Sequence, residues 1–371
     1  MKIGLSASFL EKSLNYGIVD GIGHYSRQIY EGINARGHTA VPFAFPRLLR
    51  KTRITASTPF PKSYPIQILG AKLRILKPFS PAVDVFHVTD FRGIPMDVPV
   101  ISTIWDAISF VHPEWLRPGL GRYLAPALFK EGAKFSDYVL CSSEHAANNI
   151  RKYYGVPENK ISIIPWCISE HWKSPISESA VAKARKKFKI EKNYVLAVGT
   201  LQPRKNFERL IDAFLKTLGE LQTKDMMLVI VGKAGWRCET LLNKIDAHKD
   251  VVLHLNCVDD DEDLRAIYKG SSVVAFPSLY EGFGMPALEA FASGVPLVAA
   301  DSTSIPEVVG DAAMLIDPLS IDDMSGALSD ILKHDDIAKD LVNRGHQRLD
   351  MFGEEIMFDK LFNLYSKAKN G

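Results

Sequence analysis

The stretch VLAVGTLQPRKNFERLIDAF, residues 195–214, joins a strand-like run to a helix-like run through a short loop. Its first four residues are apolar, which is typical of a strand buried on both faces of a sheet. The loop contains a glycine and a proline, and helical periodicity begins at about Asn206. A strand that leads into a helix predicts one repeat of a parallel α/β sheet. Arg204 and Lys205 would then lie at the carboxyl end of the strand.

The same alternation of short apolar runs and helical patterns continues along the chain in two series. We expect strands at 2–8, 83–89, 100–106, 138–143 and 161–166, and then at 193–200, 226–233, 251–256, 273–278, 296–301 and 313–318. We expect helices at 23–35, 120–135, 144–154, 206–220, 237–247, 261–269, 286–293 and 321–333. A chain of 371 residues is also long for one core. The sequence therefore predicts an α/β fold with two doubly wound, Rossmann-like domains.

The break between the domains is expected near 172–185, where the sequence changes from apolar to Ser/Pro-rich and then to charged. We therefore predict a first domain at 1–175 and a second at 176–352. The terminal part, 353–371, has an apolar face and is expected to form a final amphipathic helix. The proline-rich segment 46–81 is expected to be mostly loop, with a short helix at Ile68–Leu76.

Composition excludes several classes of protein. Hydrophobic residues make up 46% and charged residues 24%, and the net charge of +2 gives no case for a nucleic-acid partner. Met1 leads straight into a strand, so we expect no signal peptide. No apolar run approaches the roughly 20 residues needed to span a bilayer. The four cysteines are far apart in sequence, which favours a reducing, cytoplasmic location.

Charge is unevenly distributed, because no acidic residue occurs between Glu31 and Asp84. This basic segment, 36–77, contains Arg36, Arg47, Arg50, Lys51, Arg53, Lys62, Lys72, Arg74 and Lys77. Apolar residues interleave with these cations at Phe43, Phe45, Leu48, Leu49, Ile68, Leu69, Leu73, Ile75 and Leu76. The combination favours contact with an anionic membrane surface, although a solvated loop is the alternative.

A second motif, LYEGFGMPALEA at 279–290, places two glutamates around a glycine-rich turn. Pro286 suits the first turn of a helix, so Glu281 would lie in the loop and Glu289 on the helix. Carboxylates beside a helix amino terminus suit a ligand with hydroxyls and phosphate, such as a sugar nucleotide. The spacing alone also allows a capping glutamate and a solvated one. Arg204 and Lys205 would neutralise a diphosphate there, or else form a solvated surface pair.

A third motif, GIVDGIGHYSRQI at 17–29, follows the first strand at a distance. It lacks the third glycine of the G-x-G-x-x-G fingerprint, so it is a poor dinucleotide site. We expect a flexible loop at Gly21 and Gly23, through which the backbone reaches a phosphate from the opposite domain.

Together, Glu281-x7-Glu289, GTLQPRKN at 199–206, GIGHYSRQI at 21–29 and PLVAAD at 296–301 resemble glycosyltransferase family 4. The resemblance covers nearly the whole chain, but it is absent at 46–81. It implies a retaining nucleotide-sugar transferase of the GT-B fold. In that fold two Rossmann-like domains face each other across a cleft, and the carboxyl-terminal helix crosses back to the amino-terminal domain.

The resemblance also implies roles for individual residues. Glu281 would contact the donor sugar together with backbone amides of Phe283, Gly284 and Met285. Glu289 would accept hydrogen bonds from the ribose, and Arg204 and Lys205 would bind the diphosphate and stabilise its departure. The remaining donor contacts are assigned to Gly21, Gly23, Gly199 and Val258.

The chain departs from the family pattern in two places. Many relatives have His-Asp where this chain has Trp105-Asp106, so a histidine near the donor sugar is missing. His87, Asp106 and His112 are the candidates for the acceptor or sugar side, although a histidine after a strand can be purely structural. Trp166-Cys167 replaces the Asn-Gly that relatives usually have.

The acidic run DDDED at 259–263 resembles a metal motif, but it precedes a helix and is interpreted as capping. We therefore expect no metal and no cofactor.

The layout is most similar to bacterial mannosyltransferases of lipopolysaccharide O-antigen or exopolysaccharide assembly. The resemblance implies GDP-mannose as donor and a glycan on polyprenyl diphosphate as acceptor. The enzyme would then act as a peripheral protein on the cytoplasmic face of the inner membrane. A UDP-sugar donor remains open, as do an epimerase or phosphorylase on the same fold and a non-catalytic sugar-nucleotide-binding subunit.

Overall fold

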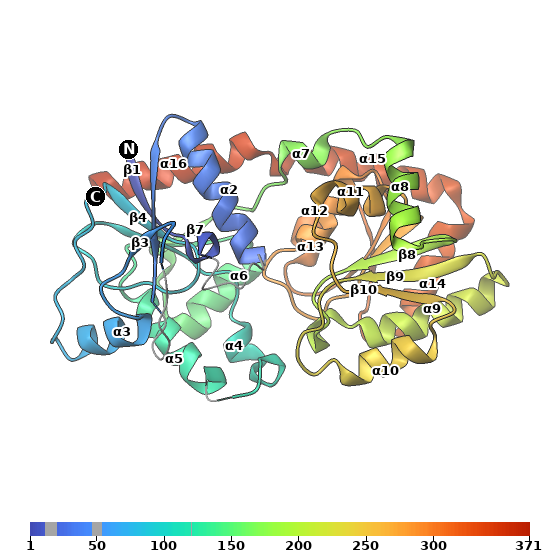
Figure 1. The fold of residues 1–371 in the computed structure, drawn as a ribbon, viewed down its shortest axis with the longest axis horizontal. Coiled ribbons are helices and arrows are strands. Elements are labelled where there is room, and N and C mark those ends of the chain that lie inside the picture. Colours follow the sequence, from blue (N-terminus) through green and yellow to red (C-terminus); the bar gives the residue numbers. More distant parts are fainter. Residues whose placement is uncertain (12–20, 47–53, 120) are drawn as a thin grey trace. The chain divides into compact units, whose positions relative to one another are not determined.

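The computed structural model describes residues 1–11, 21–46, 54–119 and 121–371. These residues form two compact units. The first contains 1–166 and 357–371, and the second contains 167–356. Each unit has a parallel sheet between two layers of helices (Figure 1), as the strand and helix pattern predicted.

The first unit has a sheet in the order β3-β2-β1-β4-β5-β6-β7. Its strands are β1 (Lys2–Ser6), β2 (Thr39–Ala44), β3 (Thr58–Pro59), β4 (Val85–Val88), β5 (Val100–Thr103), β6 (Tyr138–Cys141) and β7 (Ile161–Ile163). Its helices are α2 (Gly21–Ala35), α3 (Tyr64–Lys72), α4 (Ile108–Val111), α5 (Gly121–Ala133), α6 (Glu144–Asn149) and most of α16 (Glu354–Asn370). Helices α2 and α16 cover one face of the sheet, and α3, α5 and α6 cover the other (Figure 1).

Two of the differences between this unit and the sequence prediction involve proline residues. Strand β2 was not among the expected strands, and it contains Pro42, which lacks the N–H that a central strand donates. Pro42 pairs with Leu5 of β1, while β3 covers only Phe43 and Ala44, so no partner strand needs its N–H. Helix α3 begins at Tyr64 and not at Ile68, because Pro65 fits its first turn.

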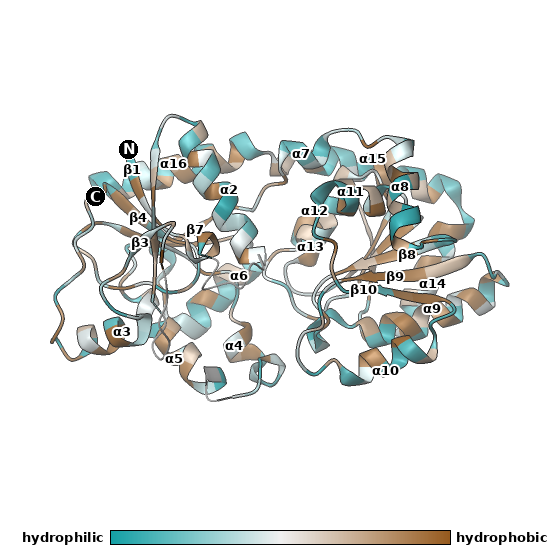
Figure 2. Ribbon diagram, in the orientation of Figure 1, coloured by the Kyte–Doolittle hydropathy of each residue, from teal (hydrophilic) through white to brown (hydrophobic). Residues whose placement is uncertain are grey.

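The second unit has a sheet in the order β10-β9-β8-β11-β12-β13. Its strands are β8 (Asn193–Val198), β9 (Met226–Val231), β10 (Val252–Leu255), β11 (Val273–Phe276), β12 (Leu297–Ala300) and β13 (Met314–Ile316). Its helices are α7 (Glu170–Lys173), α8 (Glu178–Phe188), α9 (Phe207–Leu221), α10 (Glu239–Ala247), α11 (Asp261–Lys269), α12 (Met285–Ala292), α13 (Ile305–Val309), α14 (Ile321–Lys333) and α15 (Asp335–Leu349). Figure 2 shows apolar strands such as β9 beneath helices that are polar on their outer sides.

The expected domain boundary at 175/176 is too late. Residues 167–175 group with the second unit, because the Ile168 N–H donates to the Phe352 carbonyl at 3.1 Å and Trp172 packs on Tyr268. Helix α8 begins within the stretch 172–185 where the break was expected, and Ser177 caps it by accepting from the Ala180 N–H at 3.2 Å. Val181 and Ala184 give this charged helix its buried face.

The final helix returns to the first unit from Met357 onward, as predicted. It buries Phe358, Leu361, Leu364 and Tyr365 there. Gly32 of α2 makes this contact possible, since a Cβ at position 32 would lie 2.0 Å from the Phe358 ring.

Each sheet reverses its strand order at one point. The reversal falls between β1 and β4 in the first unit and between β8 and β11 in the second. Ligands of doubly wound sheets bind outside the carboxyl ends of the strands at such a switch point. These two places are therefore where the fold favours binding sites.

Among the residues that the structure describes, no helix is both long and apolar enough to cross a membrane.

Candidate functional site

The loop after β8 runs very close to the loop after β9. Gly199 and Gly232 have φ values of +153° and +156°, which side-chain-bearing residues rarely adopt. A Cβ at position 232 would lie only 2.0 Å from the Gly199 carbonyl oxygen. Glycines at both positions therefore let the β8 loop turn toward the carboxyl end of β11, where Arg204 and Lys205 follow.

Asn206 connects this loop to two neighbouring loops through side-chain hydrogen bonds. It is buried, has a left-handed backbone (φ +61°), and is the N-cap residue of α9. Its side-chain amide donates to the carbonyls of Pro277 at 3.1 Å and Pro318 at 2.6 Å. The Leu279 N–H in turn donates to the Arg204 carbonyl at 2.7 Å. The segments after β8, β11 and β13 are thus joined at one edge of the sheet.

The two predicted phosphate-binding cations meet the predicted sugar-binding glutamate. Glu281 Oε2 lies 2.8 Å from Arg204 Nη1, and Glu281 Oε1 lies 2.6 Å from Lys205 Nζ. Burial of Glu281 by itself raises its pKa, but Arg204 and Lys205 outweigh burial and lower the pKa to about 2. The three charges form one cluster with a net charge of +1, which suits an anion.

The backbone of Glu281 is held by the loop after β12. Its N–H donates to Thr303 Oγ1 at 3.0 Å. The Ser304 hydroxyl lies between the carbonyls of Glu281 (3.0 Å) and Phe283 (2.7 Å). Thr303 and Ser304 were not among the predicted site residues, although they lie just after the predicted strand 296–301 and therefore at the same sheet edge.

The glycine-rich turn leads into α12 as the sequence predicted. Gly284 has φ +138° and stands at the N-cap, and Pro286 lies in the first turn. The first N–H groups of a helix have no partner within it. The amides near Gly284 and Met285 therefore favour negative charge at this end, while the Phe283 side chain is buried against Phe352.

Glu289 is partly buried on α12 and accepts a hydrogen bond from the Tyr268 hydroxyl at 2.6 Å. Burial raises the pKa of Glu289 to about 7. Tyr268 was not among the predicted site residues, because nothing in the sequence around it distinguishes it from a core tyrosine of α11. The two glutamates thus lie in opposite electrostatic environments.

Other predicted residues lie outside this cluster. Val258 is half-buried in the loop after β10, two strands away from β8. The acidic run after it caps α11, since Asp260 Oδ1 accepts from the N–H groups of Glu262 (2.8 Å) and Asp263 (3.4 Å). This confirms the capping interpretation. Within the described ranges, no group of three His, Cys, Asp or Glu side chains could hold a metal ion.

In the first unit, the expected glycine loop at Gly21–Gly23 is instead the first turn of α2. Gly21 is exposed and Gly23 is buried, and the helix begins earlier than predicted. Gly17 of the same motif lies outside the described residues. A phosphate contact from this side would therefore use the amino terminus of a helix and not a loop.

His87 is a structural residue and not a sugar-side residue. It is fully buried, with Nδ1 2.7 Å from the Tyr365 hydroxyl and Nε2 2.8 Å from Thr103 Oγ1. Burial lowers its pKa to about 3, so the ring is neutral. Both ring nitrogens are occupied in connecting β4, β5 and α16.

The other two candidates follow β5. Asp106 Oδ1 accepts from the Ile108 N–H at 2.9 Å and so supports the start of α4. His112 stacks on Trp115 with ring centroids 3.8 Å apart, and its Nδ1 lies 2.9 Å from Glu114 Oε1. His112 is thus held beside its sequence neighbours.

The two departures from the family pattern pack against each other. The rings of Trp105 and Trp166 are 5.6 Å apart, and Tyr25 meets both of them edge-on. Trp105 Nε1 donates to the Thr89 carbonyl at 3.1 Å, and Trp166 Nε1 donates to Gln28 Oε1 at 2.6 Å. Trp105 therefore fills an aromatic cluster in place of a polar histidine.

A buried carboxylate between two cations, near a helix amino terminus and a second carboxylate, suits a ligand with phosphates and hydroxyls. Residues 19–171 match the family described as Glycosyltransferase Family 4, and residues 180–348 match that described as Glycosyl transferases group 1. The chain therefore contains both of these glycosyltransferase domains, and it is a glycosyltransferase with the GT-B fold.

Relatives and solved structures agree with this. The chain is 29% identical over 268 residues to O-antigen chain mannosyltransferase B of Escherichia coli, covering 71% of this chain and 69% of that protein. It is 26% identical over 336 residues to MMP alpha-(1->4)-mannosyltransferase of Mycolicibacterium hassiacum, covering 85% and 77%. Sucrose-phosphate synthase from Thermosynechococcus elongatus shares the fold, with a TM-score of 0.73 at 18% identity over 99% of this chain and 98% of that one.

Proposed function

We propose that this enzyme is a retaining mannosyltransferase that moves mannose from GDP-mannose to a lipid-linked saccharide in bacterial O-antigen or exopolysaccharide synthesis. Relatives named as mannosyltransferases support the choice of sugar. The observation that carries the proposal is the cluster of Arg204, Lys205 and Glu281 at the switch point of the second unit.

Each member of the site has a role in this proposal. Arg204 and Lys205 bind the diphosphate, Glu281 holds a hydroxyl of the donor sugar, and Glu289 accepts from the ribose. The bond between the sugar C1 and the diphosphate oxygen breaks as the acceptor oxygen bonds C1 on the same face. The departing diphosphate takes the acceptor's proton. Stabilising the leaving diphosphate is then the main catalytic contribution of the two cations.

The free protein already balances part of this charge. Glu281 forms ion pairs with both Arg204 and Lys205 in the free protein. A diphosphate that binds there would take the place of the Glu281 carboxylate as the partner of the two cations. When the diphosphate takes over the cations, the Glu281 oxygens become available to a sugar hydroxyl. This exchange would couple diphosphate binding to orientation of the donor sugar.

The donor test is incubation with radiolabelled GDP-mannose, UDP-glucose or UDP-galactose in EDTA, with release of sugar and transfer measured. Turnover of GDP-mannose in EDTA is expected. If only a UDP-sugar is turned over, the donor assignment is wrong. If activity is lost in EDTA, the expected independence of metal ions is contradicted. Tight binding without turnover would favour a non-catalytic subunit.

We also propose that the first unit contacts an anionic membrane at the cytoplasmic face of the inner membrane, where a lipid-linked acceptor would be presented. On and just after α3, Leu69, Leu73 and Ile75 are 57%, 58% and 73% exposed. The cations Lys62, Lys72, Arg74 and Lys77 are exposed on the same segment. Helix α5 packs beside α3 and adds the exposed Tyr123 and Leu124 (Figure 1).

This surface is smaller than the sequence prediction for 36–77. Phe43, Phe45 and Ile68 are buried in the core of the first unit, so they cannot contact a membrane. Leu48 and Leu49, together with Arg47, Arg50, Lys51 and Arg53, lie outside the described residues.

Cosedimentation with phosphatidylglycerol vesicles tests the membrane contact. Replacing Leu69, Leu73 and Ile75 together by Ser should weaken binding at least about tenfold, because their apolar area no longer enters the lipid. The matched control replaces Leu315 and Leu319, two exposed leucines of the second unit, by Ser and should leave vesicle binding unchanged. Equal binding of both variants would contradict this surface.

A further inference from the structure

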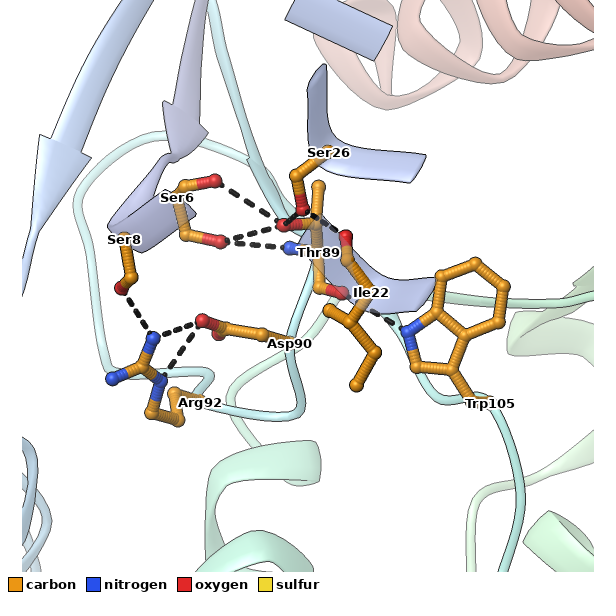
Figure 3. Close-up of polar contacts among 8 residues, drawn as sticks. All are labelled: Ser6, Ser8, Ile22, Ser26, Thr89, Asp90, Arg92 and Trp105. Atoms are coloured by element: carbon orange, nitrogen blue, oxygen red, sulfur yellow. Dashed lines mark hydrogen bonds and ion pairs between the residues drawn. The ribbon is translucent and has the colours of Figure 1, made fainter. Parts of the chain in front are cut away.

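The switch point of the first unit carries its own polar cluster (Figure 3). Thr89, after β4, donates its N–H to Ser6 Oγ of β1 at 2.9 Å. Its hydroxyl lies 2.6 Å from Ser26 Oγ of α2, and its carbonyl accepts from Trp105. These groups are buried and bonded to one another, so they form a rigid base at the carboxyl edge of β1 and β4.

Next to this base, Arg92 grips one side of Asp90. Arg92 Nε donates to Asp90 Oδ2 at 3.0 Å, and Nη2 donates to the same oxygen and to Ser8 Oγ at 2.6 Å. The guanidinium also lies over the Phe45 ring, 5.2 Å from its centroid. Asp90 is thereby fixed through a single carboxylate oxygen.

The other oxygen, Asp90 Oδ1, is buried and has no hydrogen-bond partner among the described residues. A buried carboxylate oxygen without a donor is costly, and most such atoms in proteins are satisfied. Every neighbouring hydroxyl of the base is already engaged, so no side chain there turns toward it. A hydroxyl of a bound molecule is the natural donor for this oxygen.

The charge of the cluster limits what that molecule can be. In the second unit, one carboxylate faces two cations, which leaves charge for a diphosphate. At the first switch point, Arg92 is matched by Asp90 one to one, so the pair is neutral. The free carboxylate oxygen of Asp90 can accept a hydrogen bond from a hydroxyl group. A phosphate group would bring its own negatively charged oxygens against Asp90, and the neutral pair has no spare positive charge to attract it.

We propose that Asp90, held by Arg92, is a saccharide-binding residue whose free oxygen accepts a hydrogen bond from a hydroxyl of an uncharged acceptor sugar. This inference rests on the proposed transferase function and narrows its acceptor to a neutral saccharide terminus. A sugar phosphate is disfavoured as acceptor. Trp105, bonded to the residue before Asp90, lies near enough to report on binding.

The test uses the full chain saturated with GDP and the ¹⁵N signal of the Trp105 indole, assigned with Trp105→Phe. Methyl α-D-mannopyranoside should shift this signal, and mannose 6-phosphate should bind at least about tenfold more weakly. Asp90→Asn should weaken the neutral sugar about tenfold, since an ionised acceptor is lost. The same variant should bind mannose 6-phosphate more tightly, because the positive charge of Arg92 is then no longer balanced by Asp90. A merely structural role for Asp90 would not produce opposite changes for the two sugars.

The control is Asp97→Asn, the same substitution at an exposed position before β5, which should change neither affinity. Calorimetric binding of GDP is measured on every variant. Normal GDP binding with no Trp105 shift, or tighter wild-type binding of mannose 6-phosphate, would overturn the acceptor assignment alone. If the wild-type protein neither binds GDP nor turns over GDP-mannose, the proposed function itself is overturned.

Discussion

At the scale of single residues, the two glutamates of the 279–290 motif are opposites. Two cations lower the pKa of Glu281 to about 2, and burial raises that of Glu289 to about 7. Near neutral pH, Glu281 is fully ionised and Glu289 is divided between its two forms. Pairs whose environments separate their pKa values in this way have separate roles. This separation fits the proposal that the two glutamates bind different parts of one ligand, Glu281 the sugar and Glu289 the ribose.

Replacing Glu281 by Gln should reduce sugar transfer about 100-fold or more while GDP binds at least as tightly as before. The sugar loses an oriented acceptor, but Arg204 and Lys205 lose their internal competitor. Transfer kinetics and GDP calorimetry measure the two effects separately. Reduced GDP affinity with unchanged transfer would remove Glu281 from the sugar side of the site.

Glu289 should make the enzyme less stable as pH rises. Its pKa is raised from 4.5 to about 7 in the folded protein, so its contribution is fully present below about 4.5 and is lost as pH rises to about 7. Glu289→Gln should therefore gain stability relative to the wild type between pH 5 and pH 8, by at most about 3 kcal/mol. Urea unfolding at both pH values measures this. Parallel curves for the two proteins would contradict the raised pKa.

At the scale of elements, the site depends on loops that the sequence could not join. The periodicity predicted β8 and α9 and placed Arg204 and Lys205 between them. It did not show that Asn206 would bond the carbonyls of Pro277 and Pro318. It also missed α15, because only Leu341, Gly345 and Leu349 of that helix are buried and its apolar stripe is narrow.

Asn206→Ala should destabilise the second unit by about 2–4 kcal/mol, since two buried hydrogen bonds are lost and a Cβ residue is left with a left-handed backbone. Asn206→Gly keeps the backbone relaxed and should cost less, which separates the two causes. Unfolding by urea gives the stabilities. Equal losses in both variants would show that the backbone conformation contributes nothing.

At the scale of the whole molecule, α16 completes the first unit with residues from the other end of the chain. The His87–Tyr365 hydrogen bond joins positions 278 residues apart in sequence and lies in a fully buried setting. The helix itself was predicted from its apolar face, and its return to the first unit was expected from the family resemblance. Its pairing with His87 was not, and His87 was assigned to the wrong role for that reason.

Tyr365→Phe should destabilise the first unit by about 1–3 kcal/mol, because His87 Nδ1 is left buried without a partner. Hydrogen exchange should accelerate in the first unit and stay unchanged in the second. Tyr123→Phe, at a 67% exposed position, is the matched control and should have no effect. Faster exchange in the second unit would contradict the division into units.

The sequence by itself determined the two series of strands and helices, the family, and the position of Glu281, Glu289, Arg204 and Lys205 at strand ends. It could do so because apolar runs, glycine turns and helix starts are local patterns. Tertiary structure alone decided that Glu281 lies between both cations, that Tyr268 bonds Glu289, and that one oxygen of Asp90 has no partner among the described residues. Those facts depend on which side chains meet across strands distant in sequence, and no local pattern carries that information.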